Sequence, residues 1–321
     1  MTNVLLVALG AALLATGGEA LIRGSLASAR RLGVSPLLIG LVVVGFGTSM
    51  PELVVSVEAA VSSRPDIAIG NVVGSNIANV LLILGVCAVI SPLAVGPLAL
   101  RRDAVTVVAA SVLFVVLVGG QALGRGDAAI LLAALAAYVT WAYLTERSAA
   151  HAPPAVLRRA EADEVVVVPA STAWIVAMIA LGLAALIGGS RVLLIGAVGL
   201  ATDLGVPEAV IGLTLVAVGT SLPELSISVI AAIRRHADVA VGNILGSNVF
   251  NLLGILGVSA VLQPLPVAVR VVQFDQWVML GAALVLTAFL LTGRRLSRWE
   301  GGLLLAGYAV YLVVSFTWFA G

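Results

Sequence analysis

Apolar runs of about 20 residues follow one another along this chain, separated by short polar breaks. A helix of that length spans the hydrocarbon core of a bilayer, and it satisfies its own backbone hydrogen bonds there. Strands of a membrane barrel would alternate apolar and polar residues, and these runs do not alternate. Only 10% of the residues are charged, against about 25% in soluble domains. The sequence therefore predicts an all-α integral membrane protein and excludes a water-soluble fold.

The runs predict ten transmembrane helices in two halves. We expect a first five-helix half over 1–146, a polar linker over 147–170 and a second five-helix half over 171–321. The first run is expected to be a true helix, not a cleaved leader. The single cysteine, Cys87, excludes a disulfide or a thiolate metal site within one chain. The expected spans lie near 2–22, 36–62, 69–92, 103–122, 127–145, 171–193, 206–233, 241–263, 274–292 and 301–319.

The arginines predict the orientation of the helices. All 17 basic residues are arginine, and 13 of them fall in loops on the side that holds the linker, against four on the other side. Basic residues are retained on the cytoplasmic side of membrane proteins. We therefore expect a multi-pass protein of the cell (inner) membrane, with a cytoplasmic linker and with both termini outside.

The strongest internal feature is a repeat with a constant offset of 172 residues. GLVVVGFGTSMPELVVSVEAAVSSRPDIAIGNVVGSNIAN (Gly40–Asn79) aligns without a gap with GLTLVAVGTSLPELSISVIAAIRRHADVAVGNILGSNVFN (Gly212–Asn251), and 21 of the 40 positions are identical. Five predicted helices separate equivalent points, so the copies cross the membrane in opposite directions. This inverted repeat is typical of secondary transporters, whose sites lie near the midplane where the repeats meet.

Each copy of the repeat places a glutamate after a proline inside an apolar run. The segments are GTSMPE, ending at Glu52, and GTSLPE, ending at Glu224. Proline removes a backbone donor, so each helix should kink and expose carbonyl oxygens toward a protein-lined cavity. A proline kink alone could explain one such motif, but a proline–glutamate pair at two equivalent positions points to a functional site.

A second polar motif, GNxxGSN, follows the first in each copy. Ser75 and Asn79 are four residues apart, as are Ser247 and Asn251, so each pair shares a helix face. The glycines of the motif would also serve close helix packing alone. Carboxylate, hydroxyl, amide and carbonyl oxygens are ligands for Ca²⁺ and Na⁺, and they disfavour zinc or copper.

Four further acids receive simpler interpretations. Glu58 has no acidic counterpart in the second copy, and we expect it to line a polar cavity or to lie at the membrane interface; Glu19 is expected to be interfacial. Asp66 and Asp238 match across the repeat but fall in short loops, where they are expected to cap the following helices.

The doubled motifs resemble those of the sodium/calcium exchanger family within the calcium/cation antiporter superfamily. The resemblance covers both repeats and, more loosely, all ten helices. It implies that Glu52 and Glu224 are shared calcium and sodium ligands, that Thr48 and Thr220 add backbone carbonyls, and that Asn79 and Asn251 hold the central position. By the same resemblance, one flanking sodium site is lined by Ser49, Ser75 and the Gly45 carbonyl, and the other by Ser221, Ser247 and the Ala217 carbonyl.

This resemblance predicts an antiporter, not an enzyme, that exchanges Ca²⁺ for Na⁺ by alternating access. The alternative is a Ca²⁺/H⁺ antiporter that uses the same glutamates; a channel or a nontransporting scaffold is less expected, because an inverted repeat within one chain has little use there. Asn251 stands where the family commonly has aspartate, which puts the stoichiometry and the coupling ion in question. We expect no cofactor, with the lipid bilayer and inorganic cations as partners, and neither nucleic acid nor an obligatory protein partner.

Overall fold

The computed structural model describes residues 2–97, 99–149, 171–204 and 219–319. Within these residues, seven helices are long and apolar enough to cross a membrane, or eight if one bent pair counts as a single span. The prediction of a helical membrane protein is therefore confirmed. The first half comprises α1 (Thr2–Leu32), α2 (Pro36–Ile39), η1 (Gly40–Gly45), α3 (Phe46–Thr48), α4 (Met50–Val61), α5 (Pro65–Ala78), η2 (Asn79–Leu84), α6 (Gly85–Ile90), β1 (Leu93–Ala94), η3 (Ala99–Ala104), α7 (Val105–Val118), β2 (Ala122–Leu123) and α8 (Arg125–Ala149).

The second half repeats much of this order. It comprises α10 (Thr172–Asp203), α13 (Leu222–Ile233), α14 (Ala237–Val249), η5 (Phe250–Ile255), α15 (Leu256–Leu262), β3 (Leu265–Pro266), η6 (Val271–Asp275), α16 (Gln276–Gly293), β4 (Arg295–Leu296) and α17 (Arg298–Phe319). The elements labelled η are π-helical turns, which in other proteins often mark functional sites.

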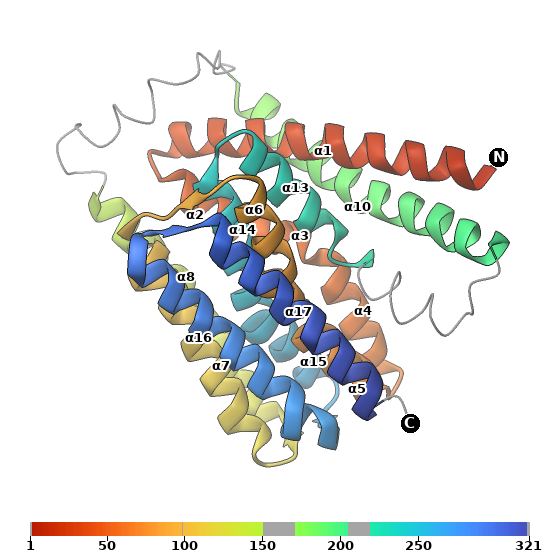
Figure 1. Ribbon diagram of the computed structural model, residues 1–321. Helices are drawn as coiled ribbons and strands as arrows, with labels where there is room; N and C mark the ends of the chain where they lie inside the picture. The colour runs from red at the N-terminus through yellow and green to blue at the C-terminus, as the bar shows by residue number, and fades with distance from the viewer. Residues whose placement is uncertain (1, 98, 150–170, 205–218, 320–321) are drawn as a thin grey trace.

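The two longest helices, α1 and α10, lie side by side across one side of the molecule (Figure 1). They are antiparallel, because Gly10 packs on Leu193 whereas Gly24 packs on Ile179. Both helices are about ten residues longer than the predicted 2–22 and 171–193. The glycine contacts continue through these extra turns. Packing between the two helices therefore extends both of them beyond the ends that hydropathy alone indicated.

Two continuous spans form the centre of the molecule. Residues Pro65–Ile90 and Ala237–Leu262 are the most buried of the candidate membrane spans, with 67% and 83% of their apolar windows inside the protein. Each contains a π-helical turn midway, η2 in the first span and η5 in the second. This burial lets the spans carry polar residues that a lipid-facing helix could not carry.

The ends of the halves are joined by two short antiparallel strand pairs. β1 pairs with β4 through Leu93 and Leu296, and β2 pairs with β3 through Ala122 and Pro266. Each pair joins a loop of the first half to a loop of the second. These pairings tie the loops of the two halves together at their ends.

One arginine that the sequence assigned to a loop is instead buried. Arg102 is only 1% exposed and binds Asp103 at 2.6 Å and Glu146 at 3.3 Å, while the Tyr138 hydroxyl donates to Asp103. The second oxygen of Glu146 accepts the backbone N–H of Ser35, just before α2. A buried charge needs such paired partners, and a count of arginines along the sequence cannot reveal them.

Candidate cation site

Both repeated glutamates lie in the first turn of a helix whose second residue is proline. Glu52 belongs to α4 and Glu224 to α13, and each is only 1% exposed. The helices before and after Ser49 are bent by 44° relative to one another, so the predicted kink is confirmed in the first copy. Residues 205–218, which precede the second kink, lie outside the described residues.

The two motifs meet through crosswise hydrogen bonds. The Ser49 hydroxyl donates to Oε1 of Glu224 at 2.9 Å, and the Ser221 hydroxyl donates to Oε1 of Glu52 at 3.2 Å. Residues about 170 positions apart in the chain thus build one buried polar centre. Each glutamate receives its hydroxyl partner from the opposite copy of the repeat.

The serines of the second motif are also grouped across the copies. The Ser75 hydroxyl lies 3.4 Å from that of Ser221, and the Ser247 hydroxyl donates to the Gly45 carbonyl at 3.0 Å. The resemblance had grouped Ser75 with Ser49 and the Gly45 carbonyl, and Ser247 with Ser221, whereas these hydrogen bonds join Ser75 to Ser221 and Ser247 to Gly45. The packing of the central helices brings each serine to the proline motif region of the other copy, which spacing within one copy cannot show.

Four glycine-mediated contacts bring the first kink against α14. A methyl group built on Gly45 would lie 2.8 Å from the Asn243 carbonyl oxygen, and one built on Gly246 would lie 2.8 Å from the Leu41 carbonyl carbon. Gly40 and Gly242 make similar backbone approaches, to Val239 and to Leu37. The π-helical turn η1 therefore packs backbone to backbone on α14, and this contact sets the position of the Gly45 carbonyl.

An asparagine supports the backbone behind each glutamate, a role that the sequence analysis missed. The amide of Asn71 donates to the Glu52 carbonyl at 3.1 Å and to Ser56 at 2.9 Å. Asn243 does the same for Glu224 at 3.3 Å and for Ser228 at 2.8 Å, and its oxygen accepts from Thr48. The signal was present, because these asparagines begin the GNxxGSN motif in both copies.

Removing one support should have a small and symmetrical effect. We expect Ser228→Ala and Ser56→Ala each to weaken the apparent calcium affinity about fivefold, since one buried hydrogen bond contributes roughly 1 kcal/mol. The measurement is the calcium dependence of flux in proteoliposomes. A loss as severe as that of a glutamate variant would mean that the serine itself binds the cation, contrary to this geometry.

Four asparagines form an amide network where the two central spans cross. Asn79 donates to the Asn248 side chain at 2.9 Å, and Asn251 donates to the Asn76 side chain at 3.1 Å. Asn76 and Asn248 also donate to each other's backbone carbonyls, at 3.2 and 3.5 Å. Asn76 and Asn248 were not among the predicted site residues, and they fix the orientation of the two that were.

The centre leaves several oxygens without a donor. Oε2 of Glu52, Oε2 of Glu224, and Oδ1 of Asn79 and of Asn251 are buried and have no hydrogen-bond partner within the described part of the chain. Buried polar atoms of this kind normally have partners. All four are acceptors of the hard-oxygen type that binds Ca²⁺ or Na⁺. The chemistry of the centre thus suits a cation.

The remaining predicted residues have mixed outcomes. Thr48 is buried and Thr220 half-buried, whereas Ala217 lies outside the described residues. Glu58 is exposed. Asp66 and Asp238 are not N-caps: α5 and α14 begin about four residues before the predicted starts, which places both acids inside the first turn. There their charge complements the helix dipole.

The chain is similar to known proteins over nearly its whole length. The family model described as sodium/calcium exchanger protein matches residues 2–144 and 174–317. The chain is 35% identical to "Sodium/calcium exchanger MaX1" of Methanosarcina acetivorans over 98% of each protein, and 36% identical to "Putative antiporter CaxA" of Alkalimonas amylolytica over 99% of each. It also resembles solved structures of the sodium-calcium exchanger NCX_Mj, with a TM-score of 0.82 and 30% identity over 97% of this chain and 98% of that one.

Proposed function

The chain belongs to the sodium/calcium exchanger family, and from this premise we propose that it exchanges Ca²⁺ for Na⁺ by alternating access. The observation that carries the proposal is the pair of buried glutamates, each with one carboxylate oxygen that has no donor among the described residues. Membership of a transporter family also fits a protein that is not an enzyme.

The two negative charges of the site suit one divalent ion, for which sodium ions would compete. Burying two carboxylates in the membrane costs several kcal/mol unless a cation or proton neutralises them. One Ca²⁺ balances Glu52 and Glu224, whereas three Na⁺ would leave the site with one positive charge. Exchange at that ratio would be electrogenic. An empty site would be unfavourable, which restrains movement of the unloaded protein.

We assign the ligands as two groups that share the glutamates. The first group surrounds Glu224 and contains Ser49, Ser247 and the Gly45 carbonyl; the second surrounds Glu52 and contains Ser221 and Ser75. Their hydrogen bonds support this division. The backbone carbonyls of Thr48 and Thr220 and the side-chain oxygens of Asn79 and Asn251 complete the proposed calcium position, and the Ala217 carbonyl is the proposed counterpart of Gly45.

The proposed architecture is ten transmembrane helices in two inverted five-helix halves, over 1–146 and 171–321, joined by a linker over 147–170. The antiparallel packing of α1 on α10 supports the inversion. We further propose that the linker is cytoplasmic and that both termini are outside, on the distribution of arginines. An inner-membrane location fits the relative named "Inner membrane protein YrbG" of Escherichia coli, 36% identical over 89% of this chain.

Calcium flux in proteoliposomes tests the coupling ion. Separate gradients of sodium, potassium and protons are imposed, and uptake of ⁴⁵Ca²⁺ is followed. We expect a sodium gradient to drive uptake and potassium to have no effect. Uptake driven by a pH gradient in sodium-free buffer would replace the proposal by Ca²⁺/H⁺ exchange, because two protons could neutralise the same glutamates. Flux without any counter-ion would indicate a channel.

Asn251→Asp tests the unusual composition of the pocket. The Asn251 amide donates to Asn76, and an ionised carboxylate cannot donate, whereas a protonated one can. We therefore expect calcium affinity about fivefold below that of the wild type at high pH, where one buried hydrogen bond is lost, and recovery as the pH is lowered. Affinity that is pH-independent relative to the wild type would contradict this view of the amide network.

A further inference from the structure

A groove lies on the outer surface where α1, α10 and the end of α13 meet, away from the cation site. Its volume is about 560 Å³ and its lining is mainly apolar. In a membrane protein such a surface is covered by lipid. The apolar part of the lining consists of Ala15, Ala20, Met178, Ile230 and Ile233.

Two arginines and one glutamate form the polar part of this groove. Arg23 binds Glu19 at 2.8 Å and Arg234 binds the other Glu19 oxygen at 3.1 Å. The arginine side chains remain 57% and 49% exposed. One carboxylate between two guanidinium groups leaves this part of the groove with a net charge of +1.

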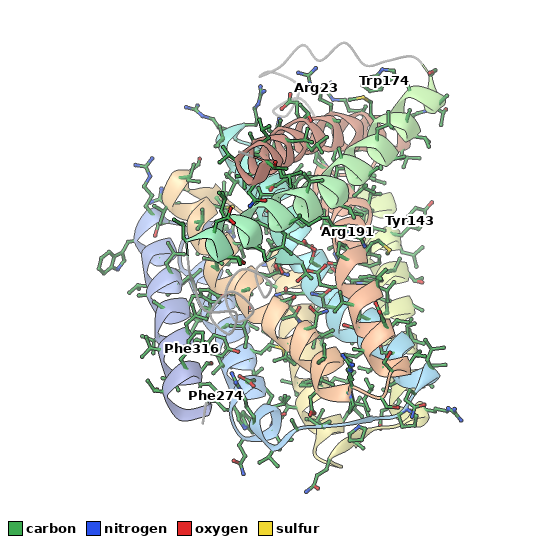
Figure 2. The ribbon with its side chains drawn as sticks, turned by 90° about the vertical axis from the view of Figure 1, so that its right-hand side faces the viewer. Arg23, Tyr143, Trp174, Arg191, Phe274 and Phe316 are labelled. Carbon is green, nitrogen blue, oxygen red and sulfur yellow. The ribbon has the colours of Figure 1, made fainter. Side chains whose placement is uncertain are left out.

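The charged part of the groove lies where α13 ends. Arg234 is the C-cap of α13, immediately before the turn that leads into α14. Trp174, in the first turn of α10, is 37% exposed, and aromatic residues of this kind are enriched at membrane–water interfaces. Figure 2 shows Arg23 and Trp174 at the same upper edge of the molecule.

We propose that this groove binds one anionic phospholipid, with its phosphate on Arg23 and Arg234 and an acyl chain along the apolar wall. Guanidinium groups bind phosphate oxygens in pairs, and basic pockets between membrane helices are suited to lipid headgroups. The net charge favours an anionic headgroup over a zwitterionic one. Glu19 competes with the phosphate for the same two arginines.

Variants that are expected to change lipid binding in opposite directions test the site. Purified protein is reconstituted in nanodiscs of phosphatidylcholine with a minor fraction of phosphatidylglycerol, and the lipid retained after extraction is counted by native mass spectrometry. We expect Arg23→Gln and Arg234→Gln each to lower phosphatidylglycerol retention about fivefold. Glu19→Gln should raise it several-fold. Arg191→Gln, an exposed arginine of α10 outside the groove, is the matched control and should leave retention unchanged.

Several results would overturn the proposal. If Arg23→Gln and Arg234→Gln retained as much phosphatidylglycerol as the Arg191→Gln control, the lipid would bind elsewhere. If the wild-type protein retained phosphatidylcholine as well as phosphatidylglycerol, the charge of the headgroup would not determine binding. Displacement of the lipid by millimolar inorganic phosphate would mean that the apolar wall contributes nothing. If the arginine variants fail to fold, Glu19→Gln still decides, because unchanged or weaker binding there contradicts the competition.

Discussion

Glu52→Gln should reduce sodium-driven calcium flux by about 100-fold or more. Glutamine has nearly the same shape and keeps an oxygen that can accept from the Ser221 hydroxyl, 3.2 Å from the native carboxylate. What is lost is one of the two negative charges that, in the proposed function, neutralise a divalent ion in a buried centre. Removing one partner of a buried charge pair costs about 2–5 kcal/mol, and every 1.4 kcal/mol corresponds to a factor of about ten.

The geometry predicts the same result for Glu224→Gln, because the two glutamates have equivalent surroundings. Glu58→Gln is the control, since Glu58 lies on α4 as well but is exposed. Calcium binding to purified protein, followed by isothermal titration calorimetry, separates loss of the site from loss of the conformational change. Thermal unfolding checks that the helices remain intact. Normal flux in either glutamate variant would refute the assignment of the cation site.

That the two motifs meet in one buried polar centre could be predicted, because the repeat presents every motif twice. A proline–glutamate pair in an apolar run is ambiguous alone, and its recurrence at Glu224 removes most of that ambiguity. The crosswise bonds from Ser49 and Ser221 join the two copies in one centre. The sequence predicted which motifs meet, because this follows from their polar composition and from the constant offset of the repeat.

The detailed grouping could not be predicted, because it depends on how helices cross in three dimensions. The bond between Ser247 and the Gly45 carbonyl joins residues from different copies, and no spacing within one copy implies it. Arg102 is a different case within the first half: its buried partners Asp103 and Glu146 are 1 and 44 positions away, and Glu146 reaches it only through helix packing. Hydropathy also ended α1 and α10 too early, because it records the preference of each residue for lipid and not its contact with a neighbouring helix.

Gly246→Ala should have the largest effect on stability of any single methyl addition in the site. The new methyl group would overlap the backbone carbonyl of Leu41, with the carbonyl carbon at 2.8 Å. Backbone cannot rotate away as a side chain can, so η1 and α14 would have to separate. Overpacking a core costs about 1–3 kcal/mol and occasionally more, and we expect the upper end of that range.

This separation should also impair transport. The Gly45 carbonyl and the Ser247 hydroxyl, 3.0 Å apart, lie on opposite sides of the same contact, so moving α14 displaces oxygens around Glu224. We expect a lower midpoint of thermal unfolding in detergent together with a calcium affinity reduced by more than tenfold, a shift that corresponds to about 1.4 kcal/mol. Gly281→Ala is the matched control: a methyl group there meets no atom within 4 Å, and alanine favours a helix interior by about 1 kcal/mol. If Gly246→Ala unfolded at the wild-type temperature and bound calcium normally, the backbone contact between η1 and α14 would not be what positions the site.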